Sequence, residues 1–201
     1  MTLSAEKTGY QISREDKRFI GWHMLVAVIA LLVGSLFGPL QALEFSGWNL
    51  YQYLSPLLES YYQGLTIHGV LNALVWTTFF IVGFTYLASV KGLGRPLSHP
   101  RLNRVGFITM IVGLVTTAVP LLIGEATVLF TFYPPLKASW AFYLGLTLIV
   151  VGSWFEGWGF MLTLRAWRKD NPGIRSPFLA FAGVLNAIMW QIATLGVAIE
   201  I

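Results

Sequence analysis

The chain has 201 residues, of which 56% are hydrophobic and only 11% are charged, and its net charge is +4. A soluble domain carries about twice that charged fraction, so the composition excludes an ordinary globular protein and most disordered ones. At about 20 residues per membrane crossing, the length allows roughly five crossings and no separate soluble domain. The absence of cysteine excludes disulfides and thiolate metal ligands, which leaves histidine as the candidate metal ligand.

The predicted fold is all-α, a single polytopic membrane domain of five spanning helices over residues 1–201. The first eighteen residues are polar, and no alanine-rich cleavage site follows the first apolar run, so we expect that helix to be retained. Pro39 is expected to end it. The sequence has no coiled-coil heptads or obvious repeats. The predicted spans are at about 19–40, 64–90, 105–123, 139–164 and 178–201.

Positive charges are distributed unevenly among the connections. The connections at 41–63 and 125–137 contain a single cation, Lys137, whereas all other lysines and arginines lie in the N-terminal segment and in the other two connections. Because cytoplasmic loops carry the Lys/Arg excess, the N-terminus is predicted to be cytoplasmic and Ile201 to end near the outer face. The positive net charge therefore reflects the orientation of the chain in a lipid bilayer, and it does not indicate nucleic-acid binding.

His68 lies a few residues into the second span from its outer end. With a rise of about 1.5 Å per residue, its ring is expected roughly 5 to 10 Å below the outer interface. Ionisable side chains inside a membrane are costly and are candidates for function. Gly64 and Gly69 flank His68 and would let a flat cofactor or a neighbouring helix approach. A histidine that only hydrogen-bonds across helices remains the structural alternative.

The other two histidines are poor partners for His68. His23 begins the first span from the inner side, so its depth should differ from that of His68 by about 15 Å. Two axial ligands of one heme must lie at nearly equal depth, so these two histidines cannot share a heme. His23 is expected to snorkel at the inner interface. His99 lies in an inner loop beside Pro100.

Glu156 is the only acidic residue well inside a predicted span. It is about 13 Å from the inner surface, where an isolated charge is unfavourable. Three interpretations stay open: a protonated side chain, a pair with a group on another subunit, or a position on a water-filled proton path.

The outer connection 125–137 contains Pro134 and Pro135, which cannot continue a helix. They indicate a rigid entry into the fourth span. Its aromatic residues are explained by a position at the membrane interface.

Four ordered segments carry a resemblance to a known family. The chain resembles subunit I of the heme–copper oxidases, specifically its B-type (ba-type) branch, over nearly the whole sequence beyond the N-terminus. The segments are GSLFGPLQAL at 34–43, YYQGLTIHGVLNA at 61–73, EATVL at 125–129, and TFYPPLK at 131–137 followed by WAFY at 140–143.

The resemblance implies a respiratory terminal oxidase that reduces oxygen and translocates protons. It implies that His68 is one axial ligand of the iron of a low-spin heme b. It also implies that Phe130 and Tyr133 lie by the oxygen channel and the active-site surroundings. Glu156 has no counterpart in the family's motifs. A high-spin heme and copper would belong to the complete complex, since their ligands lie in later helices of the family. The resemblance also implies a prokaryotic plasma membrane.

The chain is accordingly expected to be the N-terminal portion, about helices I–V, of a longer or split subunit, inactive alone. Its expected partners are the C-terminal helices of subunit I, a copper-carrying subunit II, and cytochrome c or quinol as electron donor. Two alternatives stay open: a nitric oxide reductase-like subunit, and a small helical transporter or assembly protein in which His68 is structural.

Overall fold

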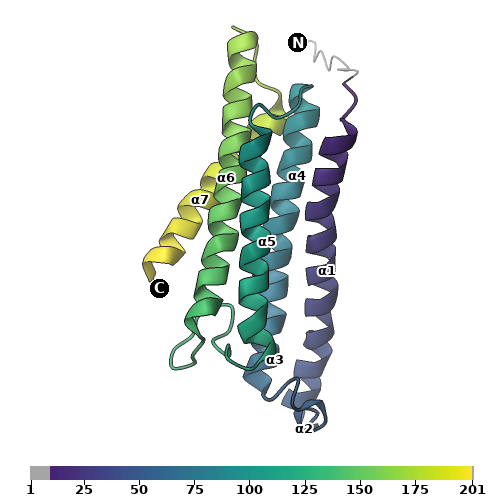
Figure 1. Cartoon of the computed structure of the whole chain (residues 1–201), viewed down its shortest axis with the longest axis vertical. Helices are drawn as coiled ribbons and strands as arrows, with labels where there is room; N and C mark the ends of the chain where they lie inside the picture. Colours follow the sequence, from purple (N-terminus) through teal and green to yellow (C-terminus); the bar gives the residue numbers. More distant parts are fainter. Residues whose placement is uncertain (1–9, 201) are drawn as a thin grey trace.

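The computed structural model describes residues 10–200, which form helices joined by loops (Figure 1). Among these residues, five helical segments are long and apolar enough to cross a membrane, which confirms the predicted five-span bundle. They are α1 (Arg14–Phe45), the continuous segment Tyr61–Leu93, α5 (Pro100–Leu122), α6 (Trp140–Asp170) and α7 (Phe178–Glu200).

Helix α1 begins in a polar segment and ends beyond its proline. The Ser13 hydroxyl accepts a hydrogen bond from the Asp16 backbone N–H at 3.0 Å, which satisfies one of the free donors of the first turn. The expectation that Pro39 ends this helix is wrong, because α1 continues to Phe45. A proline removes one backbone hydrogen bond, and membrane helices tolerate this loss because neighbouring helices and side chains satisfy the freed group.

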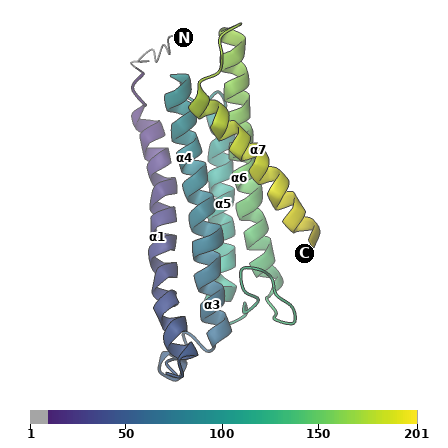
Figure 2. The ribbon, with the colours of Figure 1, turned by 180° about the vertical axis from the view of Figure 1, so that it is seen from behind.

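The second spanning segment consists of three consecutive parts. Helix α3 (Tyr61–Gly69) passes into a π-helical turn, η1 (Val70–Val75), and then into α4 (Trp76–Leu93). Figure 2 shows α3 and α4 in line as one rod. A π-helical turn shifts the register of the side chains that follow it, and such turns are frequent at functional sites. His68 lies two residues before this turn.

Helices α5 and α6 approach closely along a row of glycines. A Cβ on Gly113 would lie 2.5 Å from the Gly145 carbonyl oxygen, and a Cβ on Gly152 would lie 2.5 Å from the Gly106 carbonyl oxygen. The glycines are seven residues apart on each helix, at 106 and 113 and at 145 and 152. Small residues at helix contacts in membranes allow such packing. Because glycines contribute no apolar side chains, this seven-residue spacing does not show up as an apolar heptad in the sequence.

Helix α7 slants across α4 and α6 (Figure 2). Three tryptophan indoles hydrogen-bond between α6 and α7: Trp154 to Thr194 at 2.9 Å, Trp158 to Gln191 at 3.0 Å, and Trp190 to Ser153 at 2.9 Å. Hydrogen bonds between side chains of adjacent helices hold membrane helices together where lipid supplies no hydrophobic driving force.

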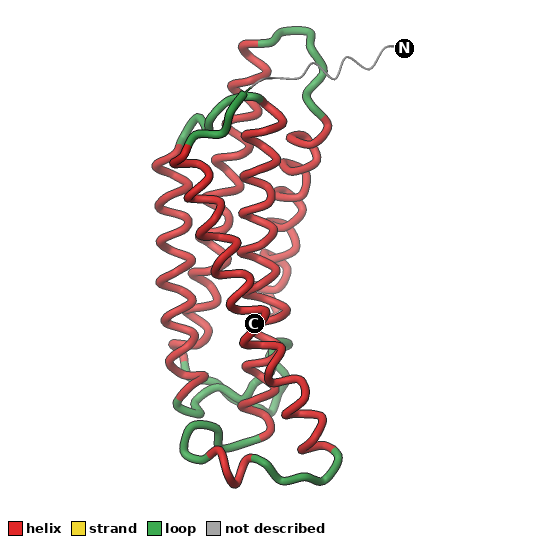
Figure 3. The backbone as a smooth tube through the Cα atoms, turned by 90° about the vertical axis from the view of Figure 1, so that its right-hand side faces the viewer, coloured by secondary structure: helices red, strands yellow, loops and turns green. Residues whose placement is uncertain are grey.

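The connections gather at the two ends of the bundle (Figure 3). The start of α1 and the α4–α5 and α6–α7 connections lie at the end drawn uppermost in Figure 1, which we call the basic end because Arg14, Lys91, Arg95, Arg165 and Arg175 are located there. The short helix α2 (Tyr51–Leu54) and the α5–α6 connection lie at the opposite end. This alternation matches the one predicted from charge; Ile201 lies outside the described residues.

The outer surface of the bundle is apolar. Leu36 on α1 is 74% exposed, Ile108 on α5 is 60% exposed and Ile192 on α7 is 67% exposed. Because a water-soluble protein rarely exposes a large contiguous apolar surface, these faces fit contact with lipid or with further helices. The chain is an integral membrane protein.

Candidate functional site

The imidazole of His68 is held against α1 by a hydrogen bond. Its Nδ1 lies 2.8 Å from the Gly34 carbonyl oxygen. One turn further along α1, a Cβ on Gly38 would lie 3.2 Å from His68 Cε1, so the absence of a side chain there lets the ring lie close to the helix. The Asn72 amide nitrogen lies 3.2 Å from the same Nδ1, but it is a donor and cannot accept the Nδ1 hydrogen that the Gly34 carbonyl takes.

The hydrogen bond to Gly34 determines which ring nitrogen is free. A carbonyl oxygen only accepts hydrogen bonds, so His68 Nδ1 carries the hydrogen, and in the neutral ring Nε2 then has a free lone pair. Nε2 has no hydrogen-bond partner among the described residues. An Nδ1–H fixed by a backbone carbonyl is the usual support of a histidine that binds metal through Nε2.

The π-helical turn beside His68 packs tightly on α1. A Cβ on Gly34 would lie 2.5 Å from Asn72 Oδ1 and 2.9 Å from Leu71 Cβ, and both of these residues belong to η1. The same glycine thus provides the carbonyl group for His68 and the space for the turn that follows it. Contact between α1 and η1 determines the position of the imidazole.

Gly64 and Gly69 admit side chains from the loops. Gly64 lies under the Tyr51 hydroxyl, which accepts a hydrogen bond from the Gln41 amide at 2.5 Å. Burial raises the pKa of Tyr51, so its hydroxyl stays protonated at neutral pH. A Cβ on Gly69 would lie 2.5 Å from Phe130 Cδ1. The two glycines therefore let α2 and the α5–α6 connection pack against the helix that carries His68.

The α5–α6 connection is fixed at both ends. An antiparallel bridge pairs Ala126 with Ala138, and the Leu129 backbone N–H donates to the Thr66 hydroxyl at 3.0 Å. Phe130 is thereby placed on α3, next to the His68 segment, although its side chain is 43% exposed. Tyr133 lies further out and is 60% exposed.

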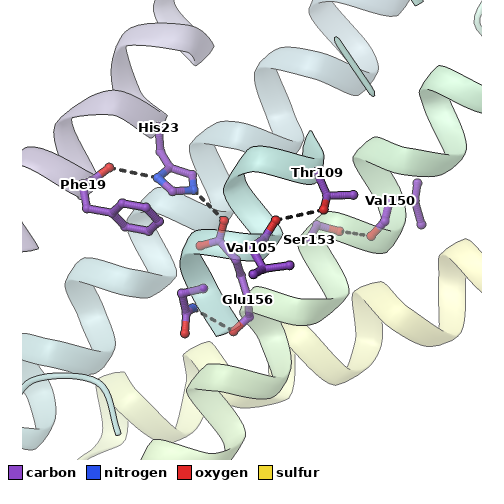
Figure 4. Close-up of polar contacts among 8 residues, drawn as sticks. Phe19, His23, Val105, Thr109, Val150, Ser153 and Glu156 are labelled. Atoms are coloured by element: carbon purple, nitrogen blue, oxygen red, sulfur yellow. Dashed lines mark hydrogen bonds and ion pairs between the residues drawn. The ribbon is translucent and has the colours of Figure 1, made fainter. Parts of the chain in front are cut away.

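His23 and Glu156 form a pair that the sequence analysis missed. His23 Nε2 lies 2.8 Å from Glu156 Oε1, and both side chains are 0% exposed (Figure 4). The expectation that His23 snorkels at the interface is wrong, because the ring points into the bundle toward Glu156. Of the three interpretations of Glu156, pairing is observed, with a histidine of this chain in place of another subunit.

Four residues around the pair make room for it or line it. A Cβ on Gly83 of α4 would lie 2.7 Å from His23 Cβ, and a Cβ on Gly106 of α5 would lie 2.7 Å from Glu156 Cγ. The rings of Phe107 and Phe79 lie with their centroids 4.6 and 6.2 Å from that of His23. The similar depth of His23 and Glu156 in the inner half was the signal in the sequence that could have predicted this contact.

The described residues contain no group of three His, Asp or Glu side chains that could hold a metal ion. His99 is exposed and precedes α5 as its N-cap residue. Because His23 is engaged with Glu156 and His99 lies in a loop, His68 is the one histidine of this chain with a ring nitrogen free inside the bundle.

Comparisons with known proteins relate the chain to one family. Residues 18–201 match the family described as cytochrome c and quinol oxidase polypeptide I. The cytochrome c oxidase subunit 1 of Thermus thermophilus is 40% identical over an alignment of 189 residues, and the match covers 92% of this chain and 33% of that protein. A solved heme-copper terminal oxidase dimer matches with a TM-score of 0.86 and 35% identity over 94% of this chain and 32% of that one. The chain thus spans about a third of both relatives.

Proposed function

Because this chain belongs to the family of cytochrome c and quinol oxidase polypeptide I, we propose that its His68 binds the iron of a low-spin b-type heme. The observation that carries the proposal is the hydrogen bond from His68 Nδ1 to the Gly34 carbonyl, which leaves Nε2 free. Gly38, where a Cβ would meet the ring, keeps the imidazole close to α1. The heme, when bound, supplies one-electron transfer.

We further propose that the chain contributes to a B-type respiratory oxidase that reduces oxygen and translocates protons. In this proposal the protein lies in a prokaryotic plasma membrane with its basic end in the cytoplasm, as the distribution of lysine and arginine indicates. Its electron donor is cytochrome c or quinol, and a copper-carrying subunit II completes the complex. Phe130, packed on Gly69, and Tyr133 would line the approach to the oxygen-reducing centre.

The second axial ligand would come from residues outside this sequence. His23 is held by Glu156 and His99 lies in the exposed connection before α5, so neither ring is available beside His68. The copper ligands and the ligand of a high-spin heme would likewise belong to further helices of the subunit. The exposed apolar side chains of α1 and α7 offer faces on which such helices would pack.

The proposal is tested by an absorption spectrum of membranes that contain the chain together with the remaining oxidase helices. His68→Ala should abolish the low-spin b-type signal, because it removes the nitrogen that binds the iron. His99→Ala is the matched control and should leave the signal at its normal strength, since His99 lies in an exposed connection. A full low-spin signal in the His68→Ala complex would refute the assignment.

Gly34→Ala should disturb the same signal without removing the ligand. The added Cβ would lie 2.9 Å from Leu71 Cβ, which cannot rotate away, so α1 or η1 must shift and the Gly34 carbonyl must move relative to His68 Nδ1. Because that hydrogen bond orients the imidazole and tunes its basicity, we expect a changed midpoint potential of the heme and about 10-fold weaker heme retention.

Gly21→Ala on the same helix is the control, because nothing lies within 4 Å of its added Cβ. A midpoint potential that is unchanged in Gly34→Ala would show that the Gly34 carbonyl does not set the properties of the site. Redox titration of both variants beside the parent complex gives the comparison.

A further inference from the structure

The pair of His23 and Glu156 has polar atoms that its own hydrogen bond leaves without partners. Glu156 Oε2 is buried and has no hydrogen-bond partner among the described residues. Asn103 Oδ1, on the neighbouring helix α5, is likewise buried without a partner among them. Asn103 donates through its amide to the Glu156 backbone carbonyl at 3.3 Å. Burying an oxygen without a hydrogen-bond donor destabilises the fold, so such an atom usually has a functional role or a bound water.

The hydrogen bonds of His23 determine how many protons the pair holds. Nδ1 lies 3.0 Å from the Phe19 carbonyl oxygen, which only accepts, so Nδ1 carries a hydrogen. The contact between Nε2 and Glu156 Oε1 then holds one further proton, either on an imidazolium that faces a carboxylate or on a carboxylic acid that faces a neutral ring. Both forms have zero net charge, which suits a fully buried site.

A cavity of about 150 Å³ lies at the basic end, where polar side chains line it together with Phe19, Leu97 and two prolines. Tyr86 donates to Asp16 Oδ1 at 2.8 Å inside it, and the Ser13 hydroxyl donates to Asp16 Oδ2 at 2.7 Å. Arg104, paired with Glu15, is part of its wall. A polar cavity of this size can hold several waters, each of which needs two to four polar partners.

The side chain of Phe19 separates this cavity from His23. It lines the cavity, and its ring centroid lies 5.3 Å from that of Tyr86 and 4.9 Å from that of His23. Figure 4 shows Phe19 and Glu156 on opposite sides of the imidazole. One aromatic ring therefore stands between the polar cavity and the buried pair.

We propose that His23 and Glu156 form a proton-binding site inside the membrane that exchanges its proton with water in the Ser13–Asp16–Tyr86 cavity past Phe19. Exchange breaks the Nδ1–H bond of the imidazolium on the Phe19 side and gives the proton to a water as hydronium. A hydronium in the cavity then returns a proton to Nδ1 and becomes water again. No electron is transferred. The charged and titratable groups that face this route are Glu15 and Asp16 on α1, Tyr86 on α4 and Arg104 on α5.

The proposal does not rest on the assignment of His68, because the pair and the cavity share no contact with that ring. Heme binding and proton exchange are therefore measured separately. A negative result for heme binding at His68 leaves the proposal for His23 and Glu156 intact, and the reverse holds too.

The test follows hydrogen exchange at His23 Nδ1 by NMR of the full chain labelled with ¹⁵N-histidine in lipid nanodiscs, after transfer to D₂O. His68→Gln and His99→Gln assign the three signals. Phe19→Ala should accelerate exchange at His23 at least about tenfold, because the ring no longer has to move aside. Phe79→Leu is the control: it replaces an aromatic ring 6.2 Å from His23 that does not line the cavity and keeps most of the volume that encloses the imidazole, so exchange should stay within about twofold.

Unchanged exchange in Phe19→Ala would overturn the proposal, and so would equal acceleration in both variants, because the latter means a general loosening of the bundle. If Phe19→Ala does not fold, Phe19→Leu keeps most of the volume and should give a smaller acceleration in the same direction. A second measurement uses Glu156→Gln, which removes the carboxyl group that shares the proton: the ¹⁵Nε2 chemical shift of His23 should move to that of a neutral ring. An unmoved shift would show that His23 is not an imidazolium and would overturn the exchange step proposed here.

Discussion

Gly145→Leu is expected to separate α5 from α6 and to unfold a large part of the bundle. A Cβ at this position would lie 2.5 Å from the Thr117 backbone nitrogen and 2.6 Å from the Gly113 carbonyl oxygen. Both are backbone atoms that cannot rotate away as a side chain does. Overpacking a core costs about 1–3 kcal/mol when side chains can adjust, so we expect a loss of more than about 3 kcal/mol in the free energy of unfolding. Unfolding in mixed micelles, followed by circular dichroism, measures it.

The control for this prediction is Gly21→Leu, at a position where nothing lies within 4 Å of the added Cβ. The same side chain added there should change the free energy of unfolding by less than about 0.5 kcal/mol. Equal destabilisation by the two substitutions would mean that α5 and α6 do not depend on their glycine contacts.

Glu156→Ala is expected to cost about 3–5 kcal/mol, because it leaves His23 buried without its partner. The imidazole is 0% exposed and enclosed by Phe79 and Phe107, so water cannot replace the lost hydrogen bond without opening the bundle. His23→Ala should have a comparable effect through the orphaned carboxyl group. The same unfolding measurement gives both values.

The double variant His23→Leu with Glu156→Met separates the energy of the pair from that of its packing. Replacing both members of a buried pair by apolar side chains of similar volume is often neutral. We therefore expect the double variant to regain most of the stability that Glu156→Ala loses, while the proton exchange proposed for the pair disappears. Two single losses that simply add in the double variant would show that the residues do not interact.

The number of spans and their alternating ends could be predicted because each depends on local composition. Twenty apolar residues in a row can satisfy their backbone in lipid only as a helix, and clusters of lysine and arginine mark one end. The end of α1 was placed wrongly at Pro39. A proline signals a helix end in water, where the freed carbonyl is easily solvated, but this signal is weaker where other helices surround it.

The candidate site was only partly accessible from the sequence. Depth along a helix follows from counting residues, and this singled out His68 and Glu156 as ionisable side chains inside the bundle. The direction in which a side chain points depends on which helices are neighbours, and hydropathy does not contain that information. His23 was therefore assigned to the interface, although it faces Glu156 across the space between α4 and α5.

Close helix contacts were missed for a related reason. The glycines at 106, 113, 145 and 152 are spaced by seven residues, but none contributes an apolar side chain, so a search for apolar repeats passes over them. Their meaning depends on pairing between two helices: each becomes necessary because a backbone lies opposite it. Small residues at seven-residue intervals on consecutive spans would have predicted the contact between α5 and α6.

The contact between His23 and Glu156 also bears on the order in which the chain is assembled. It joins the first spanning helix to the fourth, across 133 residues of sequence. A ribosome must therefore complete three more helices before His23 can meet its partner. Until then His23 is without the carboxyl group that faces it in the finished bundle. Formation of this contact during synthesis requires that the first four spanning helices have come together.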